Sequence, residues 1–288
     1  MYQKIILGTA QFGMNYGISN KLGKIKSKNI IKILNLIRKN KIKFLDTANS
    51  YQKSEKEIGN YYKIKKKKFD VITKYSFSNK KSIQNQLEET YKNLGYYPNT
   101  ILAHSYKDYS SKVYQEGITN IKKQYPIKNF GASIYNPKEI EKIINIRKPD
   151  VIQVPCNILD KRFLSKKIIN LIKRNSIKLH VRSIFLQGLF FLDIKKICKN
   201  FKNNIKIFKK LEKIAFEEKL SIGELSLIWA IKKKEIDKIV IGVDGLTHLH
   251  DNFKTIKKNI SKKNYKIIDK LNLNRNKIIK PYLWKTKL

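Results

Sequence analysis

The chain has 288 residues, a mass of 33.9 kDa and 41% hydrophobic residues, which is enough apolar material to bury a core. Its formal net charge is +41, and lysine carries nearly all of the positive charge, since the only arginines are Arg38, Arg147, Arg162, Arg174, Arg182 and Arg275. A protein that reads bases is expected to use more arginine, because the guanidinium fork pairs bidentately with guanine. The lysines run along the whole chain without a basic tail. We therefore interpret them as solvated faces and expect no nucleic-acid partner.

Targeting, membrane and metal features are not visible in the sequence. The apolar stretch at the N-terminus is too short for a signal peptide, and no run approaches the roughly 20 apolar residues of a transmembrane helix. Cys156 and Cys198 show neither metal-ligand spacing nor a disulfide framework. His248 and His250, two residues apart on an expected helix, point in different directions, so we predict no metal site. We expect a cytoplasmic protein without a membrane partner, either a monomer or a weak homo-oligomer.

Short apolar runs alternate with longer segments of helical periodicity along the whole chain. Strands are predicted at residues 4–7, 43–46, 69–74, 100–104, 129–133, 151–154, 178–182 and 238–242. Such alternation implies parallel strands joined by right-handed helical crossovers. Eight units of this kind favour an α/β fold of the closed (β/α)8 TIM-barrel type over an open sheet, as one domain over residues 1–288.

The segment between the seventh and eighth predicted strands is longer than one crossover needs. We predict a loop over the barrel mouth at 190–204 and an added helix at 205–220. A further helix is predicted to begin at Ser221, which forms a capping box with Glu224.

Four polar residues lie at or just after the ends of three neighbouring predicted strands. Asp46 ends the second strand and Tyr51 follows it, Lys74 ends the third strand, and His104 ends the fourth. Active sites of such barrels form at the C-terminal ends of the strands, so these side chains should converge. A phenol titrates near about pH 10, a nearby ammonium favours its ionised form, and a carboxylate keeps that ammonium charged. With a histidine to bind a carbonyl oxygen, the set suits protonation of an alkoxide formed by hydride addition.

A series of short motifs runs through nearly the whole chain. Residues 7–13 read Leu-Gly-Thr-Ala-Gln-Phe-Gly, residues 44–51 read Phe-Leu-Asp-Thr-Ala-Asn-Ser-Tyr, residues 72–74 read Ile-Thr-Lys, and residues 102–104 read Leu-Ala-His. In this order, they resemble the motifs of the aldo-keto reductase superfamily. The resemblance implies an NAD(P)H-dependent carbonyl reductase in which Tyr51 is the general acid and Lys74 lowers its pKa. Asp46 would pair with Lys74, and His104 would orient the carbonyl.

The resemblance also implies residues that bind the cofactor, NADP or NAD. Ser133 and Gln153 match positions that hold the nicotinamide carboxamide. Gly242 would let the backbone approach the pyrophosphate, and Asp251 and Asn252 match contacts to the adenine end. The full set of implied cofactor residues is Ser133, Gln153, Asn157, Arg182, Gly242, Asp251 and Asn252.

Three positions depart from the family pattern. Ile134 replaces an asparagine that usually contacts the carboxamide, and Arg182 replaces an aromatic ring that usually stacks on the nicotinamide. The loop at 241–248 lacks the usual lysine and arginine that bind the NADP 2′-phosphate, and Asp244 would repel that phosphate if it pointed inward. His248, His250 or a neighbouring lysine would then have to substitute. We predict weak discrimination between NADPH and NADH, below about tenfold or roughly 1.4 kcal/mol.

The substrate is expected to be a small-molecule carbonyl compound. Residues 13–18, 182–188 and 281–284 are similar to a bacterial branch of the superfamily associated with surface-polysaccharide and nucleotide-sugar genes, which implies a sugar or an anionic sugar nucleotide. Two other functions stay open. A nicotinamide-nucleotide sensor with incidental turnover would not need all four polar residues at the mouth. A nucleic-acid-binding protein would show a salt dependence of about one log–log unit per phosphate contacted.

Overall fold

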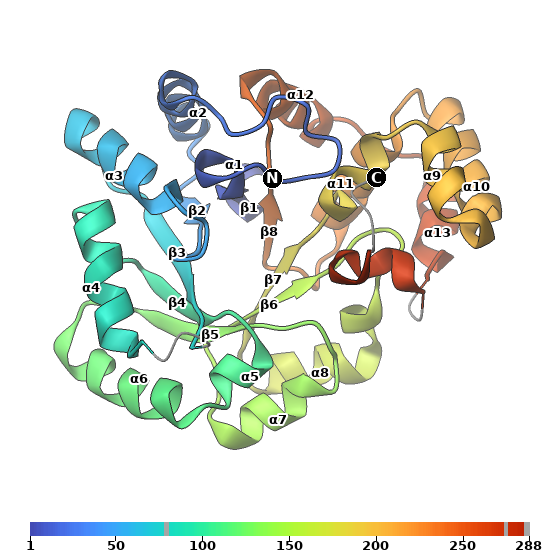
Figure 1. The fold of residues 1–288 in the computed structure, drawn as a ribbon. Helices are drawn as coiled ribbons and strands as arrows, with labels where there is room; N and C mark the ends of the chain where they lie inside the picture. The colour runs from blue at the N-terminus through green and yellow to red at the C-terminus, as the bar shows by residue number, and fades with distance from the viewer. Residues whose placement is uncertain (78–80, 274–275, 285–288) are drawn as a thin grey trace.

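The computed structural model describes residues 1–77, 81–273 and 276–284, and in these ranges eight parallel strands close into a barrel in the order β1 to β8 (Figure 1). Pairing of β1 with β8 closes the barrel, with Ile6 opposite Val240. This confirms the predicted (β/α)8 fold, and every strand boundary lies within one residue of its predicted position. The strands are β1 Ile5–Gly8, β2 Phe44–Asp46, β3 Asp70–Tyr75, β4 Thr100–Ala103, β5 Asn129–Ser133, β6 Val151–Pro155, β7 Lys178–Arg182 and β8 Lys238–Ile241.

The barrel interior is apolar in its middle and polar at its C-terminal end. Ile6, Ile72, Leu102, Val151 and Val240 form a buried cluster of their own, separate from the larger core between strands and helices. Side chains alternate along a strand with a period of two, so the next inward-facing residue lies one layer closer to the mouth. Two residues beyond Ile72, Leu102 and Val151 lie Lys74, His104 and Gln153, so polar side chains follow the apolar cluster directly at the mouth.

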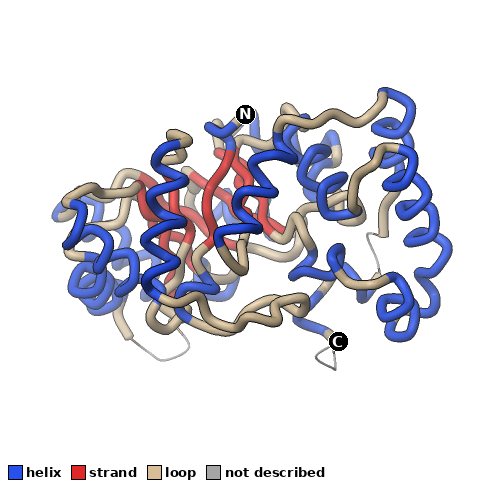
Figure 2. The backbone as a smooth tube through the Cα atoms, turned by 90° about the horizontal axis from the view of Figure 1, so that it is seen from above, coloured by secondary structure: helices blue, strands red, loops and turns tan. Residues whose placement is uncertain are grey.

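Helices surround the barrel on its outer side (Figures 1 and 2). Their inner faces are apolar at helical spacing, as in α2, where Ile30, Ile33, Leu34 and Ile37 are buried. Helix α11 is buried along nearly its whole length, because α10, α12 and α13 pack around it. The helices are α1 Ala10–Gly13, α2 Ser27–Lys39, α3 Ser54–Lys65, α4 Ile83–Leu94, α5 Tyr106–Tyr109, α6 Lys112–Gln124, α7 Glu139–Ile146, α8 Lys166–Arg174, α9 Ile194–Asn200, α10 Ile205–Glu217, α11 Ile222–Lys232, α12 Leu246–Ile256 and α13 Lys262–Lys270.

The segment between β7 and β8 differs in part from the prediction. The added helix is present as α10, and Ser221 and Glu224 form the expected capping box of α11. The stretch 190–204, however, is only in part a loop over the mouth, where Phe191 lies. It contains α9, whose first turn is capped by the Asp193 carboxylate accepting from the Lys195 N–H at 2.6 Å. Figure 1 places α9 beside α10 at the edge of the molecule, where Ile197 is buried.

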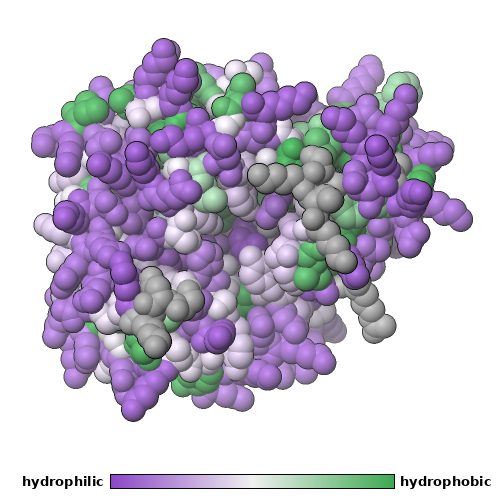
Figure 3. Space-filling model, in the orientation of Figure 1, coloured by the Kyte–Doolittle hydropathy of each residue, from purple (hydrophilic) through white to green (hydrophobic). Residues whose placement is uncertain are grey.

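On the face shown in Figure 3, polar residues predominate and a hollow lies near the centre, over the barrel. Among the helices of the described residues, none combines the length and the apolarity that crossing a membrane requires.

Candidate active site

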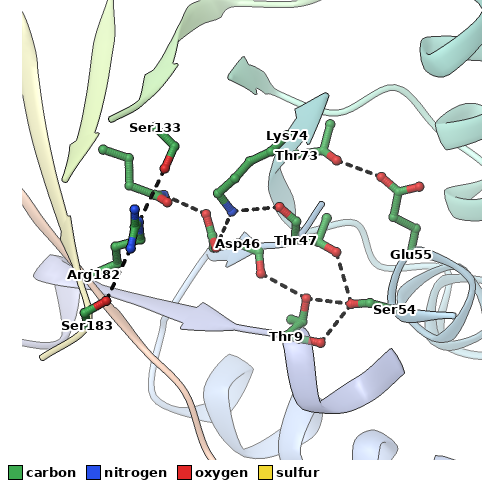
Figure 4. Close-up of polar contacts among 11 residues, drawn as sticks. Thr9, Asp46, Thr47, Ser54, Glu55, Thr73, Lys74, Ser133, Arg182 and Ser183 are labelled. Atoms are coloured by element: carbon green, nitrogen blue, oxygen red, sulfur yellow. Dashed lines mark hydrogen bonds and ion pairs between the residues drawn. The ribbon is translucent and has the colours of Figure 1, made fainter. Parts of the chain in front are cut away.

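A buried ion pair lies at the centre of the barrel mouth (Figure 4). Lys74 Nζ donates to Asp46 Oδ2 at 2.6 Å and to the Thr47 carbonyl at 2.9 Å. The other carboxylate oxygen, Asp46 Oδ1, accepts from Gln153 Nε2 at 2.7 Å. The side chains of Lys74 and Asp46 are 1% and 5% exposed. Burial lowers the pKa of the Lys74 ammonium from its usual value, while Asp46 acts in the opposite direction.

A hydroxyl network fixes the loop that follows β2 (Figure 4). Thr47 Oγ1 donates to Ser54 Oγ at 3.0 Å, and the hydroxyls of Ser54 and Thr9 lie 2.8 Å apart. Thr9 Oγ1 also donates to the Asp46 carbonyl at 2.9 Å. The network therefore joins the ends of β1 and β2 to the start of α3 on both sides of Tyr51, and it limits where the Tyr51 ring can lie.

Gly13 supports the same loop, a role that the sequence reasoning did not assign. A Cβ on Gly13 would lie 1.8 Å from the Tyr51 carbonyl oxygen, so only glycine permits this contact between α1 and the Tyr51 turn. The glycine was visible in the 7–13 motif, but its partner lies on another strand–helix unit and is seen only in the fold.

The four side chains predicted to converge do so. Lys74 Nζ lies 5.3 Å from the centroid of the Tyr51 ring. The rings of Tyr51 and His104 meet edge to face, with centroids 6.3 Å apart. Asp46 completes the set through its ion pair with Lys74. A phenol, an imidazole and an ammonium–carboxylate pair thus face one another at one end of the barrel.

The protonation states correct one expectation. Lys74 was expected to lower the pKa of Tyr51, but burial raises the pKa of this phenol well above its usual value, and Asp46 adds to the effect. Burial is the main cause, and the Lys74 ammonium is itself paired with Asp46 at 2.6 Å. Burial, Lys74 and Arg182 together lower the pKa of His104 to about 4. At neutral pH the site therefore holds a protonated phenol and a neutral imidazole.

Next to the ion pair, two buried polar atoms lack a partner among the described residues: Gln153 Oε1 and Arg182 Nη2. The first is an acceptor and the second is a donor. Ser133 lies with them, since its Oγ accepts from Arg182 Nε at 3.3 Å. A primary carboxamide carries both a donor and an acceptor, so this group of atoms fits a nicotinamide carboxamide. Ile134, which replaces the usual asparagine of the family, is fully buried in the core. The hydrogen-bond donor that the asparagine would have offered to the carboxamide could come from Arg182 instead.

A groove of about 610 Å³ runs from the mouth across the end of β8. Asp46, Tyr51 and Arg182 line one part of it, and Gly242 lies between them and the far part. Its volume is typical of small-molecule and cofactor sites, which span roughly 300–1,000 Å³. A Cβ on Gly242 would lie 3.1 Å from Gln11 Nε2, so a side chain there would narrow the groove. The far part is lined by Ser221, Glu224, Asp244, His248, Asp251, Asn252, Lys254, Thr255 and Lys258.

Three of the expected cofactor residues are almost fully buried and are not among the residues that line the groove: Ser133, Gln153 and Asn157. The Asn157 Nδ2 donates to the Ser183 carbonyl at 3.1 Å, and the Asn157 Oδ1 accepts from the backbone N–H groups of Leu159 and Asp160 at 2.9 and 3.1 Å. These bonds occupy the amide in a turn after β6. Asn157 therefore supports the loop after β7.

Carboxylates and lysines are paired at the far part of the groove. Lys258 Nζ lies 2.7 Å from Glu224 Oε1, and Lys254 Nζ lies 3.8 Å from Asp251 Oδ1. Asp244 does face inward, where it accepts from Gln11 Nε2 at 3.3 Å. Across the described parts of the chain, no cluster of three or more His, Cys, Asp or Glu side chains could hold a metal ion.

Comparisons with known proteins agree with the fold and identify the family. The thermostable aldo-keto reductase Tm1743, solved in complex with the inhibitor epalrestat, has a TM-score of 0.70 and 20% identity over 92% of this chain and 94% of its own. The holo form of the aldo-keto reductase AKR11C1 from Bacillus halodurans has a TM-score of 0.75 and 17% identity over 94% of this chain and 92% of its own. A comparison with curated proteins finds no match. The model of the Aldo/keto reductase family matches residues 4–273. The chain is therefore an enzyme that belongs to the aldo/keto reductase family, whose activity is NAD(P)H-dependent carbonyl reduction.

Proposed function

We propose that this enzyme reduces the aldehyde or ketone group of a sugar or nucleotide sugar, with Tyr51 as the general acid. The observation that carries the proposal is the protonated Tyr51 phenol beside neutral His104 and the Lys74–Asp46 pair, at one end of the groove.

The side chains of the mouth have distinct roles in this reaction. A reduced nicotinamide nucleotide, when bound, supplies the hydride. The Tyr51 hydroxyl is protonated at neutral pH, since even an ordinary phenol titrates at about pH 10, so it can give that proton to the substrate oxygen. Lys74, held by Asp46, and Arg182, which opposes the rise in the Tyr51 pKa, would be the cations beside the phenolate that remains. The neutral imidazole of His104 can donate a hydrogen bond to the same substrate oxygen and so orient the carbonyl.

The cofactor would place its carboxamide on Ser133, Gln153 and Arg182, where one buried acceptor and one buried donor lack partners. Its adenine end would extend towards Asp251 and Asn252. The two lysines that line the described groove already have carboxylate partners, so neither is a free cation for a 2′-phosphate. This pairing supports use of both NADPH and NADH.

Polar groups near Tyr51 support a hydroxylated substrate. Tyr16, Ser183 and Gln187 line the groove, and Gln187 Nε2 donates to the Tyr16 hydroxyl at 3.2 Å. Ser183 and Gln187 belong to the motif at 182–188 on which the similarity to the polysaccharide-associated branch rests. Arg182 and the net charge of +41 would attract an anionic sugar nucleotide.

The test is a panel of substrates, with the reduction of each measured as the loss of absorbance of the reduced nicotinamide. Keto-sugars, aldoses and their nucleotide derivatives are compared with apolar ketones and aromatic aldehydes of similar size, each with NADPH and with NADH. We expect kcat/KM to be highest for a sugar or nucleotide sugar. A consistent preference for the apolar compounds would contradict the substrate class. Cofactor binding without turnover of any carbonyl in the panel would favour the sensor function instead.

A further inference from the structure

We propose that the Arg182 guanidinium makes the cofactor site bind the reduced nicotinamide nucleotide more tightly than the oxidised one. The inference rests on the proposed function, because it requires the carboxamide to lie on Ser133 and Gln153.

Arg182 is held in a defined position at the end of β7 (Figure 4). Its Nε donates to Ser133 Oγ and its Nη1 to Ser183 Oγ, both at 3.3 Å. Its guanidinium carbon lies 4.3 Å from the centroid of the Tyr135 ring, which covers one side of the cation. The third nitrogen, Nη2, is buried without a hydrogen-bond partner in the described structure. The charge is therefore fixed next to the residue expected to bind the carboxamide.

The positive charge of Arg182 is not compensated by an ion pair. Among the ion pairs of the described residues, none includes Arg182, and the nearby carboxylate of Asp46 already accepts from Lys74 and Gln153. The charge influences the whole mouth. It contributes to the lowered pKa of both His104 and Lys74, and it opposes the rise in the pKa of Tyr51.

The two redox forms of the cofactor differ in the charge of the nicotinamide ring. The oxidised ring carries a formal positive charge and the reduced ring is neutral. Because Ser133 Oγ accepts from Arg182 Nε at 3.3 Å, a carboxamide on Ser133 and Gln153 would bring its ring next to the guanidinium. The oxidised form would then be repelled and the reduced form would not. Like charges about 5 Å apart at an effective dielectric constant of about 20 repel by more than the equivalent of a tenfold change in affinity. An aromatic residue at this position would exert no such repulsion.

Two other features influence the ratio of the Kd values of the oxidised and reduced cofactor, and both can be separated from the effect of Arg182. The 2′-phosphate is common to NADPH and NADP⁺, so its contribution cancels in the ratio of their Kd values. The net charge of +41 also favours the reduced form, because that form carries one more unit of negative charge. Arg174, on the outer helix α8, is an exposed arginine whose removal changes the net charge equally. Arg174→Met is therefore the matched control.

The experiment measures the Kd of NADPH and of NADP⁺ by isothermal titration calorimetry, without any substrate. The wild-type protein should bind NADPH at least tenfold more tightly. Arg182→Met should reduce this ratio by tenfold or more, mainly through tighter binding of NADP⁺. Arg182→Lys, which keeps the charge, should preserve most of the ratio, and Arg174→Met should leave it unchanged.

Two results would overturn the inference while leaving the proposed function intact. One is a wild-type ratio near one. The other is an Arg182→Met protein in which both forms bind more weakly by the same factor, since that would make Arg182 only a hydrogen-bonding or stacking group. Binding of neither form to the wild-type protein would instead contradict the proposed function, and this inference with it.

Discussion

Replacement of Lys74 by methionine should destabilise the folded protein at neutral pH. Methionine fills most of the same space but removes the ammonium, which lies 2.6 Å from Asp46 Oδ2. The Asp46 side chain is only 5% exposed, and its remaining side-chain partner is the Gln153 amide at 2.7 Å. Breaking a buried ion pair by removing one partner costs about 3–5 kcal/mol, because the other charge is left uncompensated. We expect a loss of that size in the free energy of unfolding.

Unfolding in urea, followed by circular dichroism, measures this loss. The double variant Asp46→Asn/Lys74→Met should be more stable than Lys74→Met alone, since it no longer buries an unpaired carboxylate. Lys112→Met, whose lysine side chain is 86% exposed, should change stability by less than about 0.5 kcal/mol. The reasoning would be refuted if Lys74→Met were within about 1 kcal/mol of wild type, or if the two substitutions at the pair were additive.

Three further predictions follow from the geometry of the mouth and the groove. Gly13→Ala should lower kcat by at least about tenfold, with little change in the Kd of the cofactor, because the new Cβ would displace the Tyr51 turn; unchanged steady-state kinetics would contradict the role of this contact. The pKa of His104 is lowered to about 4, so between pH 6.5 and 4 the unfolded state takes up a proton that the folded state does not. Relative to His104→Gln, the wild-type protein should therefore lose up to about 3 kcal/mol of stability across that range, and parallel pH profiles would contradict this. Finally, kcat/KM with NADPH and with NADH should differ by less than about tenfold, because the groove lysines are paired; a preference of several hundredfold would show that other lysines bind the 2′-phosphate.

The strands could be predicted from the sequence because they depend on local patterning. The convergence of the four mouth residues could be predicted because it follows from the barrel topology. Apolar runs mark the strands, and parallel strands of a barrel bring their C-terminal ends together. Asp46, Lys74 and His104 each lie at or next to a predicted strand end, so the topology alone places them near one another.

The features that were missed depend on tertiary contacts. The bond from Asn157 to the Ser183 carbonyl could not be predicted, because Ser183 belongs to a different loop. The raised pKa of Tyr51 depends on burial and on the charge of Asp46. Helix α9 is different, since its capping residue Asp193 and the helical spacing of Ile194 and Ile197 were visible, but it has only seven residues. It was therefore predicted as a loop.

The central claim is that Tyr51 donates the proton, and Tyr51→Phe tests it most directly. The substitution removes only the hydroxyl from a half-buried ring, so the fold and the Kd of the cofactor should not change. With a carbonyl substrate found in the panel, kcat should fall by about 10²-fold or more, as expected for the loss of a general acid. A Tyr51→Phe enzyme that keeps most of its kcat would contradict the mechanism.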